Sequence, residues 1–362
     1  MGCVSIKKVC NDSYLKRLLF ITTVGCLILT IFVGISIYFI YSSDEVSDKI
    51  IVKKTGSNPH IYGDRVVWED HRNQDKDIYL YELDTNCEIP ICVTPGDQIQ
   101  PRIFEKYIVW QDNRHGNWDI FMYDLQKKKE IPICIEKHDQ KNPDINNNII
   151  TWSDQRYYYE DINNRTTNDF PNIFYFNITS DEFVCINKKA AGQVKSVIQS
   201  TRILYLEIGH HMTNNEVSPY RSLMLYDVIR KENQIIYSSQ NIMGFDFNQN
   251  NVVFQTLEGY NNHIYYLDIN TNLIEEVTID REVSEDYVDN AYPQIDQDLI
   301  LWRSNHKDLA YINISSEISG ILETNISGFS IHNNIVVFEA IDVDNSNETY
   351  ENSSIYFVEI SL

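Results

Sequence analysis

The chain has 362 residues, of which 43% are hydrophobic, 23% charged and 12% aromatic. This composition excludes an intrinsically disordered protein, because it supplies enough apolar side chains for a large buried core. The net charge of −22 argues against nucleic acid as a partner, since an acidic surface repels the phosphate backbone. The 24 tyrosines and 15 phenylalanines outnumber the 13 glycines and 9 prolines, which favours a mostly β structure.

The first predicted element is a transmembrane helix at residues 18–41. These 24 residues carry no charge, and about 20 helical residues are enough to span the hydrocarbon core of a bilayer. A cleaved signal peptide would have a shorter apolar region of about 7–15 residues. Basic side chains precede the span and acidic ones follow it, so we expect residues 1–17 in the cytoplasm. The protein is therefore predicted to cross the cell membrane once, with its C-terminal part extracytoplasmic.

The part after the span is predicted to be one domain. Residues 42–48 read as a linker, and residues 49–362 as the folded region. Residues 42–362 carry 26 basic and 51 acidic side chains, a net charge of −25, which keeps this part soluble and away from anionic lipid.

A repeat runs through this domain. Its clearest mark is a strand-like apolar run that ends in Trp68, Trp110 and Trp152, at a constant spacing of 42 residues. A fixed period of this length is typical of repeat architectures. Four weaker copies end at Tyr205, Phe254, Trp302 and Phe338. Each of the seven copies carries a second apolar run, which begins at Ile78, Ile120, Ile173, Leu223, Ile264, Leu309 or Ile355.

Each repeat reads as four antiparallel strands, and seven such units predict an all-β, seven-bladed β-propeller. A flat array would leave sheet edges and apolar faces open, and an elongated β-solenoid would need shorter turns. The seventh copy lacks its fourth strand, because the chain stops at Leu362 directly after the third. The apolar residues within 49–55 are placed to supply that missing strand and to close the ring.

The first three repeats share a finer motif. Its members are Asp97-Gln98, Pro101, Ile108-Val109-Trp110, Asp112, Arg114, Gly116-Asn117, Asp119-Ile120 and Tyr123-Asp124-Leu125, with partial copies at Asp70, Arg72, Asp77-Ile78 and Leu83, and at Gln140, Pro143, Asp154 and Arg156. This pattern resembles the TolB-like and WD40-like propeller repeats of bacterial and archaeal surface proteins. The resemblance covers residues 57–156 and implies a propeller in an extracytoplasmic setting. Such modules serve as protein- or glycan-binding surfaces far more often than as enzymes.

The Asp-x-Arg motif gives the candidate ligand-binding face. Its residues follow the second strand of each of the first three repeats, so they should lie on one face of the ring: Asp70, Arg72, Asp112, Arg114, Asp154 and Arg156. Two interpretations stay open. The aspartates cap their own turns while the arginines lock adjacent blades, or these side chains grip a polar ligand.

Histidines gather on the same predicted face. His115 and His211 are the two that we assign to the candidate ligand-binding face, and five more lie in loops of that side: His71, His138, His210, His263 and His306. Some propeller lyases that act on pectin fragments bind a metal through histidines at such a face, and imidazole suits transition metals. Solvated loop histidines are the other interpretation, and no specific motif indicates a metal or a cofactor.

The exported cysteines and sequons add two expectations. Cys92, Cys134 and Cys185 occupy equivalent outer-strand positions too far apart for a disulfide, so they read as buried thiols. Asn-x-Ser/Thr sequons at loop positions make Asn164, Asn347 and Asn352 the glycosylation candidates, if the host glycosylates.

Together these observations predict a membrane-anchored, extracytoplasmic propeller that binds a protein or a glycan without catalysis. No catalytic residue is assigned, because no hydrolase, zinc-protease or phosphate-loop motif occurs. Two alternatives stay open: a lyase-like, carbohydrate-active enzyme with a metal at the histidine-rich face, and a scaffold subunit of an envelope complex.

Overall fold

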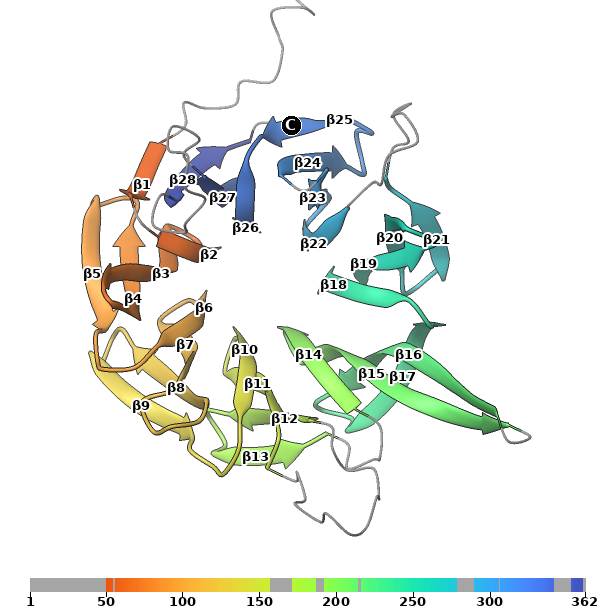
Figure 1. Ribbon diagram of the computed structural model, residues 1–362, viewed down its shortest axis with the longest axis horizontal. Helices are drawn as coiled ribbons and strands as arrows, with labels where there is room; N and C mark the ends of the chain where they lie inside the picture. Colours follow the sequence, from red (N-terminus) through yellow and green to blue (C-terminus); the bar gives the residue numbers. More distant parts are fainter. Residues whose placement is uncertain are drawn as a thin grey trace, which may run out of the picture. The chain divides into compact units, whose positions relative to one another are not determined.

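The computed structural model describes residues 50–54, 56–156, 171–186, 192–213, 216–278, 290–305, 307–341 and 353–360 of the chain. In these ranges 28 β-strands form seven antiparallel sheets of four strands each. Figure 1 shows the sheets as blades around a common axis, in sequence order. The prediction of an all-β, seven-bladed propeller is confirmed.

We call the four strands of a blade a to d, from the axis outward. The strands a, which line the axis, are β2 (Gly56–Tyr62), β6 (Gln98–Phe104), β10 (Gln140–Asn146), β14 (Gly192–Gln199), β18 (Ile242–Asn248), β22 (Ala291–Asp296) and β26 (Ile326–His332). The strands b are β3 (Arg65–Asn73), β7 (Tyr107–Asp112), β11 (Ile149–Asp154), β15 (Arg202–Thr213), β19 (Asn251–Glu258), β23 (Leu299–Ser304) and β27 (Ile335–Ile341).

The two outer strands complete each blade. The strands c are β4 (Asp75–Glu82), β8 (Asp119–Asp124), β12 (Asn172–Asn177), β16 (Glu216–Asp227), β20 (Asn261–Asp268), β24 (Asp308–Asn313) and β28 (Ser353–Glu359). The strands d are β5 (Cys87–Cys92), β9 (Lys129–Cys134), β13 (Glu182–Cys185), β17 (Glu232–Ser239), β21 (Leu273–Glu276), β25 (Ser319–Glu323) and, in blade 7, β1 (Ile50–Lys54).

The ring closes through its first strand. β1 pairs antiparallel with β28, with Ile50 opposite Phe357 and Lys54 opposite Ser354. Blade 7 is thus built from both ends of the domain, in the order β1-β28-β27-β26. The closing strand lies where the sequence pattern placed it.

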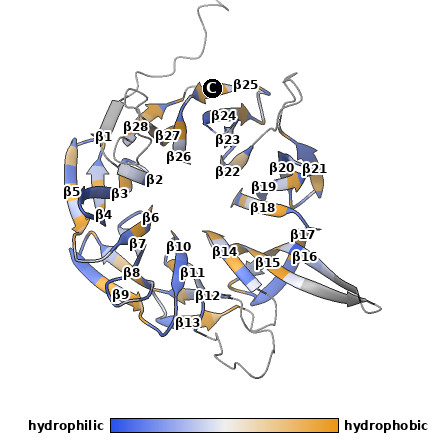
Figure 2. Cartoon of the chain, viewed as in Figure 1, coloured by the Kyte–Doolittle hydropathy of each residue, from blue (hydrophilic) through white to orange (hydrophobic). Residues whose placement is uncertain are grey.

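Strands b are buried on both faces because each blade stacks on the next. Every residue of β7 and β11 is buried, and the three repeat tryptophans have no exposed surface. One core cluster joins Val109 and Met122 of blade 2 to Trp152 and Phe174 of blade 3. Figure 2 shows hydrophobic residues recurring along the strands of successive blades. Each repeat of 42 residues therefore supplies one blade that packs against the next.

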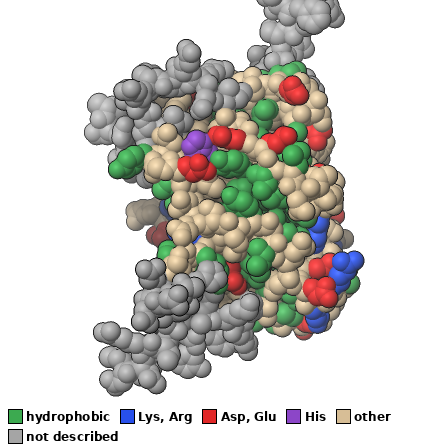
Figure 3. All heavy atoms as spheres, turned by 90° about the vertical axis from the view of Figure 1, so that its right-hand side faces the viewer, with side chains coloured by type: hydrophobic (Ala, Val, Ile, Leu, Met, Phe, Trp, Pro, Cys, Tyr) green, Lys and Arg blue, Asp and Glu red, His purple; other side chains and the backbone are tan. Residues whose placement is uncertain are grey.

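The outer strands of blades 4 and 5 leave apolar side chains in solvent. Ile235 of β17 is 62% exposed, and Leu273 and Ile274 of β21 are 50% and 42% exposed. Figure 3 shows hydrophobic side chains gathered on this side of the ring. Nothing in the described structure covers them.

Several predictions concern residues that lie outside the described ranges. They include the transmembrane segment 18–41, the linker 42–48 and the glycosylation candidates Asn164, Asn347 and Asn352. Within the described part of the chain, no helix has the length and hydrophobicity needed to cross a bilayer.

Candidate functional site

The Asp-x-Arg motifs form three clasps of the same geometry. In blade 1 the Arg72 guanidinium donates two hydrogen bonds to Asp70, Nε to Oδ1 at 2.7 Å and Nη2 to Oδ2 at 2.6 Å. The Trp68 indole also donates to Asp70, at 3.1 Å. Burial raises the pKa of Asp70, but the hydrogen bonds from Arg72 and Trp68 outweigh it and lower the pKa below its ordinary value.

The second and third clasps also tie neighbouring blades together. Arg114 is bidentate to Asp112, at 2.9 and 2.6 Å, and its Nη2 lies 3.0 Å from the Cys92 sulfur of blade 1. Arg156 is bidentate to Asp154, at 3.0 and 2.7 Å, and its Nη2 lies 2.9 Å from the Cys134 sulfur of blade 2.

Aromatic rings complete the clasps. The guanidinium carbons of Arg72, Arg114 and Arg156 lie 4.1–4.3 Å from the ring centres of strand-c aromatic residues, a cation–π arrangement. The three aspartates have no exposed surface. The donors and acceptors of this motif are therefore largely engaged within the protein. This agrees with the structural interpretation, in which the arginines lock adjacent blades.

The described histidines on the loop side lie apart, each with its own partner. His115 Nδ1 is 2.8 Å from Asp119, His263 Nδ1 is 2.6 Å from Glu276, and His71 Nε2 is 2.8 Å from the Ser57 hydroxyl. Among the residues that the structure describes, no three His, Cys, Asp or Glu side chains are grouped so that they could hold a metal. His306 and the side chains of His210 and His211 lie outside the described structure.

The four described cysteines are free thiols. Cys92 and Cys134 are buried, as predicted. The prediction of a buried Cys185 is wrong: it is half-buried, because its short strand β13 has no fully buried residue, and Cys87 is exposed. Burial raises the pKa of both Cys92 and Cys134 to about 12. These two thiols are therefore protonated and unreactive at neutral pH.

A large hollow lies on the propeller axis. Two adjoining cavities of about 510 and 480 Å³ share His60, Asp144 and Asp246 in their walls, and together they form an axial channel. Nearly all of the lining comes from strands a, so every blade contributes to it. Pockets of this size bind small ligands in many proteins.

A β-bulge recurs at the channel wall. In all seven blades the register between strands a and b shifts at the same place, two to four residues into strand a. Five blades have a residue with positive φ there, ten residues before the aromatic residue of strand b: Asn58, Gln100, Asn142, Lys195 and Tyr292. Bulges re-aim side chains, and all five of these residues line the channel mouth.

Neighbouring blades hold these bulges in place. The side chains of Glu339, Glu69 and Gln111 accept hydrogen bonds from the backbone N–H groups of Asn58, Gln100 and Asn142, at 3.3, 2.9 and 2.9 Å. The acceptor comes from strand b of the preceding blade in each case. The channel mouth is thus positioned by hydrogen bonds between blades.

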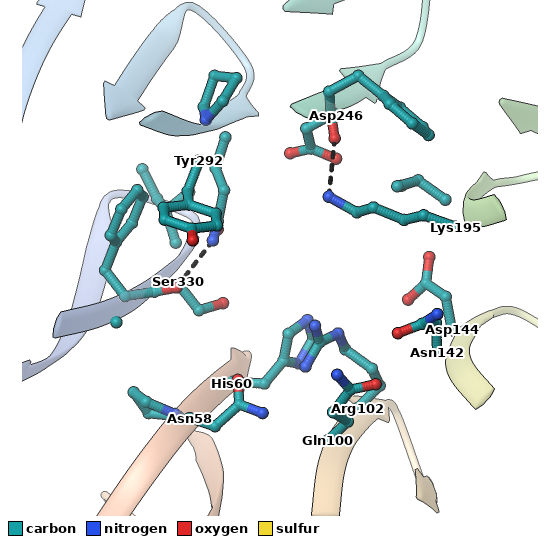
Figure 4. Close-up of a pocket in the computed structure, with 18 of the residues that line it drawn as sticks. Asn58, His60, Gln100, Arg102, Asn142, Asp144, Lys195, Asp246, Tyr292 and Ser330 are labelled. Carbon is teal, nitrogen blue, oxygen red and sulfur yellow. Dashed lines mark hydrogen bonds between the residues drawn. The ribbon is translucent and has the colours of Figure 1, made fainter. Parts of the chain in front are cut away.

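Charges of opposite sign alternate inside the channel on four successive blades: Arg102, Asp144, Lys195 and Asp246 (Figure 4). None of them forms an ion pair within 4.0 Å with another described residue. The Lys195 ammonium donates to the carbonyl oxygen of Phe245 at 3.2 Å. The backbone N–H groups of Ile198 and Ile295 donate to Asp144 and Asp246, at 2.8 and 3.0 Å.

The channel shifts the pKa values of these groups away from the charged state. Burial raises the pKa of Asp246 to about 6 and raises that of Asp144. Burial also lowers the pKa values of Lys195 and Arg102, although the Lys195 side chain is open to the channel. Burial and the nearby Arg102 charge lower the pKa of His60 well below its ordinary value, so its ring is neutral. Displaced pKa values of this kind cluster at functional sites.

At the far end of the channel, the last residues of strands a contact one another. Asn146 donates to Gln199 at 2.7 Å, Gln199 to Asn248 at 3.3 Å, and Asn248 to Asp296 at 3.1 Å. On the remaining blades the rings of Phe104, Tyr62 and His332 pack together, with centres 4.4 and 4.5 Å apart. This end is held by internal contacts, whereas the charged side chains nearer the mouth have few partners.

The channel residues were missed from the sequence, although a signal was present. Four of the five positive-φ residues stand directly before a proline of strand a: Asn58-Pro59, Gln100-Pro101, Asn142-Pro143 and Tyr292-Pro293. Aligning the seven repeats on the strand-b aromatic residue places Arg102, Asp144 and Asp246 at one level, eight residues before it, and Lys195 two residues earlier. The Asp-x-Arg motif was predicted to form the ligand-binding face instead, because its residues match a known repeat pattern.

Comparison with known proteins extends the description of the fold but not of the function. No family model matches the chain, and no curated protein does. Among solved structures, the β-propeller domain of the trilobed protease from Pyrococcus furiosus shares 11% identity and a TM-score of 0.63, over 86% of this chain and 96% of that one. Oligogalacturonate lyase from Vibrio parahaemolyticus shares 12% identity and a TM-score of 0.57, over 86% and 91%.

A TolB structure from Acinetobacter baumannii is also similar, with 12% identity and a TM-score of 0.42 over 61% of this chain and 53% of that one. The two structures with the higher TM-scores are the propeller domain of a protease and a lyase. At these identities the likeness shows the β-propeller fold and no activity.

Proposed function

We propose that the protein is a non-catalytic binding module that recognises a protein or a glycan through the axial channel. The observation that supports this proposal most is that four charged side chains of the channel form no ion pair with another described residue. Charges that are partly withdrawn from water cost free energy unless something satisfies them, and a ligand at the mouth would do so. We place the ligand contacts here because the donors of the Asp-x-Arg clasps are already engaged.

The proposal includes the membrane setting predicted from the sequence. Residues 18–41 would anchor the chain, residues 1–17 would be cytoplasmic and the propeller would lie outside. The uncharged 24-residue span, the basic flank before it and the TolB-like and WD40-like pattern of blades 1–3 support this arrangement. We assign no cofactor and no nucleic acid partner.

The binding role can be tested on the full-length protein in lipid nanodiscs. Its ligands would first be identified on a glycan array and among purified extracellular proteins of the host. Replacing both Arg102 and Lys195 with alanine should abolish binding, whereas the matched double variant of the exposed Arg230 and Lys137 should keep it. The proposal fails if the channel variant binds like the wild type, or if a bound ligand is converted into a product.

A further inference from the structure

The charge pattern of the channel restricts the class of ligand, and this step rests on the proposed function. Cations and carboxylates alternate from blade 2 to blade 5, so each cation has a carboxylate on a neighbouring blade. The charges of these four side chains cancel, and the further cation that lines the cavity, Arg303, packs on the ring of Tyr292. A ligand with a net charge would be attracted by the two side chains of opposite charge and repelled by the two side chains of like charge. The net charge of the chain, −22, further opposes an acidic ligand.

Alternating donors and acceptors match a ligand whose groups do both. A hydroxyl group donates one hydrogen bond and accepts others. Arg102 and Lys195 can only donate, whereas ionised Asp144 and Asp246 can only accept. Neighbouring hydroxyls on a sugar ring can therefore each accept from a cation and donate to a carboxylate. The amides of Asn58, Gln100 and Asn142 at the same mouth add further donors and acceptors.

An aromatic ring faces these charges across the channel mouth. Tyr292 lines the mouth and is 59% exposed, and the Arg303 guanidinium carbon lies 4.6 Å from its ring centre. Its φ of 56° is unusual for a bulky residue and marks a strained backbone. The strain is retained at a position that presents an apolar ring face to the channel. In Figure 4, Tyr292 lies across the open space from Asp144 and Lys195.

We propose that the mouth of the axial channel binds a neutral saccharide, with its hydroxyl groups on Lys195, Asp246, Arg102 and Asp144 and a face of its ring against Tyr292. The cavity of about 510 Å³ at the mouth is large enough for a ligand of mono- or disaccharide size.

Calorimetric titration of the full-length protein in nanodiscs tests this inference. The neutral probes are glucose, galactose, mannose, N-acetylglucosamine and cellobiose, and the charged probes are galacturonic acid, glucosamine and glycine, the last a zwitterion without net charge. We expect saturable binding of at least one neutral sugar and weaker binding of all charged probes. Lys195→Met, Asp246→Asn and Tyr292→Ala should each weaken that binding about tenfold or more, as expected when a bond to a charged group or a stacking contact is lost.

Matched controls exist on the surface of the same chain. Lys137→Met, Asp84→Asn and Tyr260→Ala replace exposed residues of the same three types and should leave the affinity unchanged. Circular dichroism and the melting temperature establish that each variant is folded, and Asp246→Asn keeps the shape of the site if the larger changes do not fold. Preference for a charged probe, or no neutral-sugar binding at 50 mM, overturns the inference.

These failures are distinct from failure of the proposed function. A charged saccharide or a purified protein whose binding still requires Arg102 and Lys195 would leave the channel as the binding site and refute only the neutral-sugar assignment. Neutral-sugar binding that is unaffected by all three channel variants would refute both.

Discussion

At the level of single residues, the carboxyl group of Asp246 contributes to the proposed binding site but lowers stability at neutral pH. One of its oxygens accepts a hydrogen bond from Ile295, yet burial still raises its pKa to about 6 from an ordinary value of 3.8. The folded state therefore binds more protons than the unfolded state between about pH 4 and pH 6. Stability contributed by protonated Asp246 is present below pH 4 and is lost as the pH rises through 6.

Replacement of this carboxyl group should consequently stabilise the protein at neutral pH. We expect Asp246→Asn to raise the free energy of unfolding at pH 7.5 by up to about 2 kcal/mol, because a neutral amide avoids the cost of the buried charge. The gain should shrink toward zero at pH 4, where the wild-type group is protonated. Urea unfolding at both pH values measures this, and a gain that grows as the pH falls would contradict the assignment.

The clasp residues should behave in the opposite way. Asp112 has no exposed surface and holds both Arg114 and the Trp110 indole. Asp112→Ala should lower the free energy of unfolding by about 3 kcal/mol, because it removes the acceptor of the Trp110 indole and of two hydrogen bonds from Arg114, which keeps only its ion pair with Glu130. Asp84→Ala, at an exposed turn, is the control. Equal stability of the two variants in urea unfolding would show that the clasp has no structural role.

At the level of the elements, the strands were predictable but the channel wall was not. The apolar runs that end in Trp68, Trp110 and Trp152 identified strands b because burial on both faces requires continuous hydrophobicity. Strand a instead contains a bulge, which breaks the alternation that assigns each side chain to a face. Sequence patterns therefore gave the blades but not the side chains that enter the channel.

The closing strand leads to a prediction at the same level. β1 supplies the outer strand of blade 7 through its pairing with β28. A chain that begins at Gly56 should melt at a clearly lower temperature than one that begins at Ser42, because the edge of β28 and the apolar residues beneath it become exposed. Scanning calorimetry of the two chains measures this, and equal melting temperatures would contradict closure by β1.

At the level of the whole molecule, the distribution of charge predicts the topology. Four basic residues lie before the uncharged span, and residues 42–362 carry a net charge of −25. We expect protease added to intact cells to remove the propeller and to leave a small membrane-bound N-terminal fragment. Immunoblots with antibodies against each end detect both products. Protection of the propeller until the cells are lysed would mean that the predicted orientation is wrong.

The central claim is that the axial channel is where the ligand binds. A crystal structure of the propeller grown with a saturating neutral disaccharide tests it most directly. We predict density for a sugar ring against Tyr292, with hydroxyl groups in hydrogen-bond reach of Lys195 and Asp246. Sugar density at the Asp-x-Arg clasps or on the outer strands, with the channel mouth holding only water, would contradict the account.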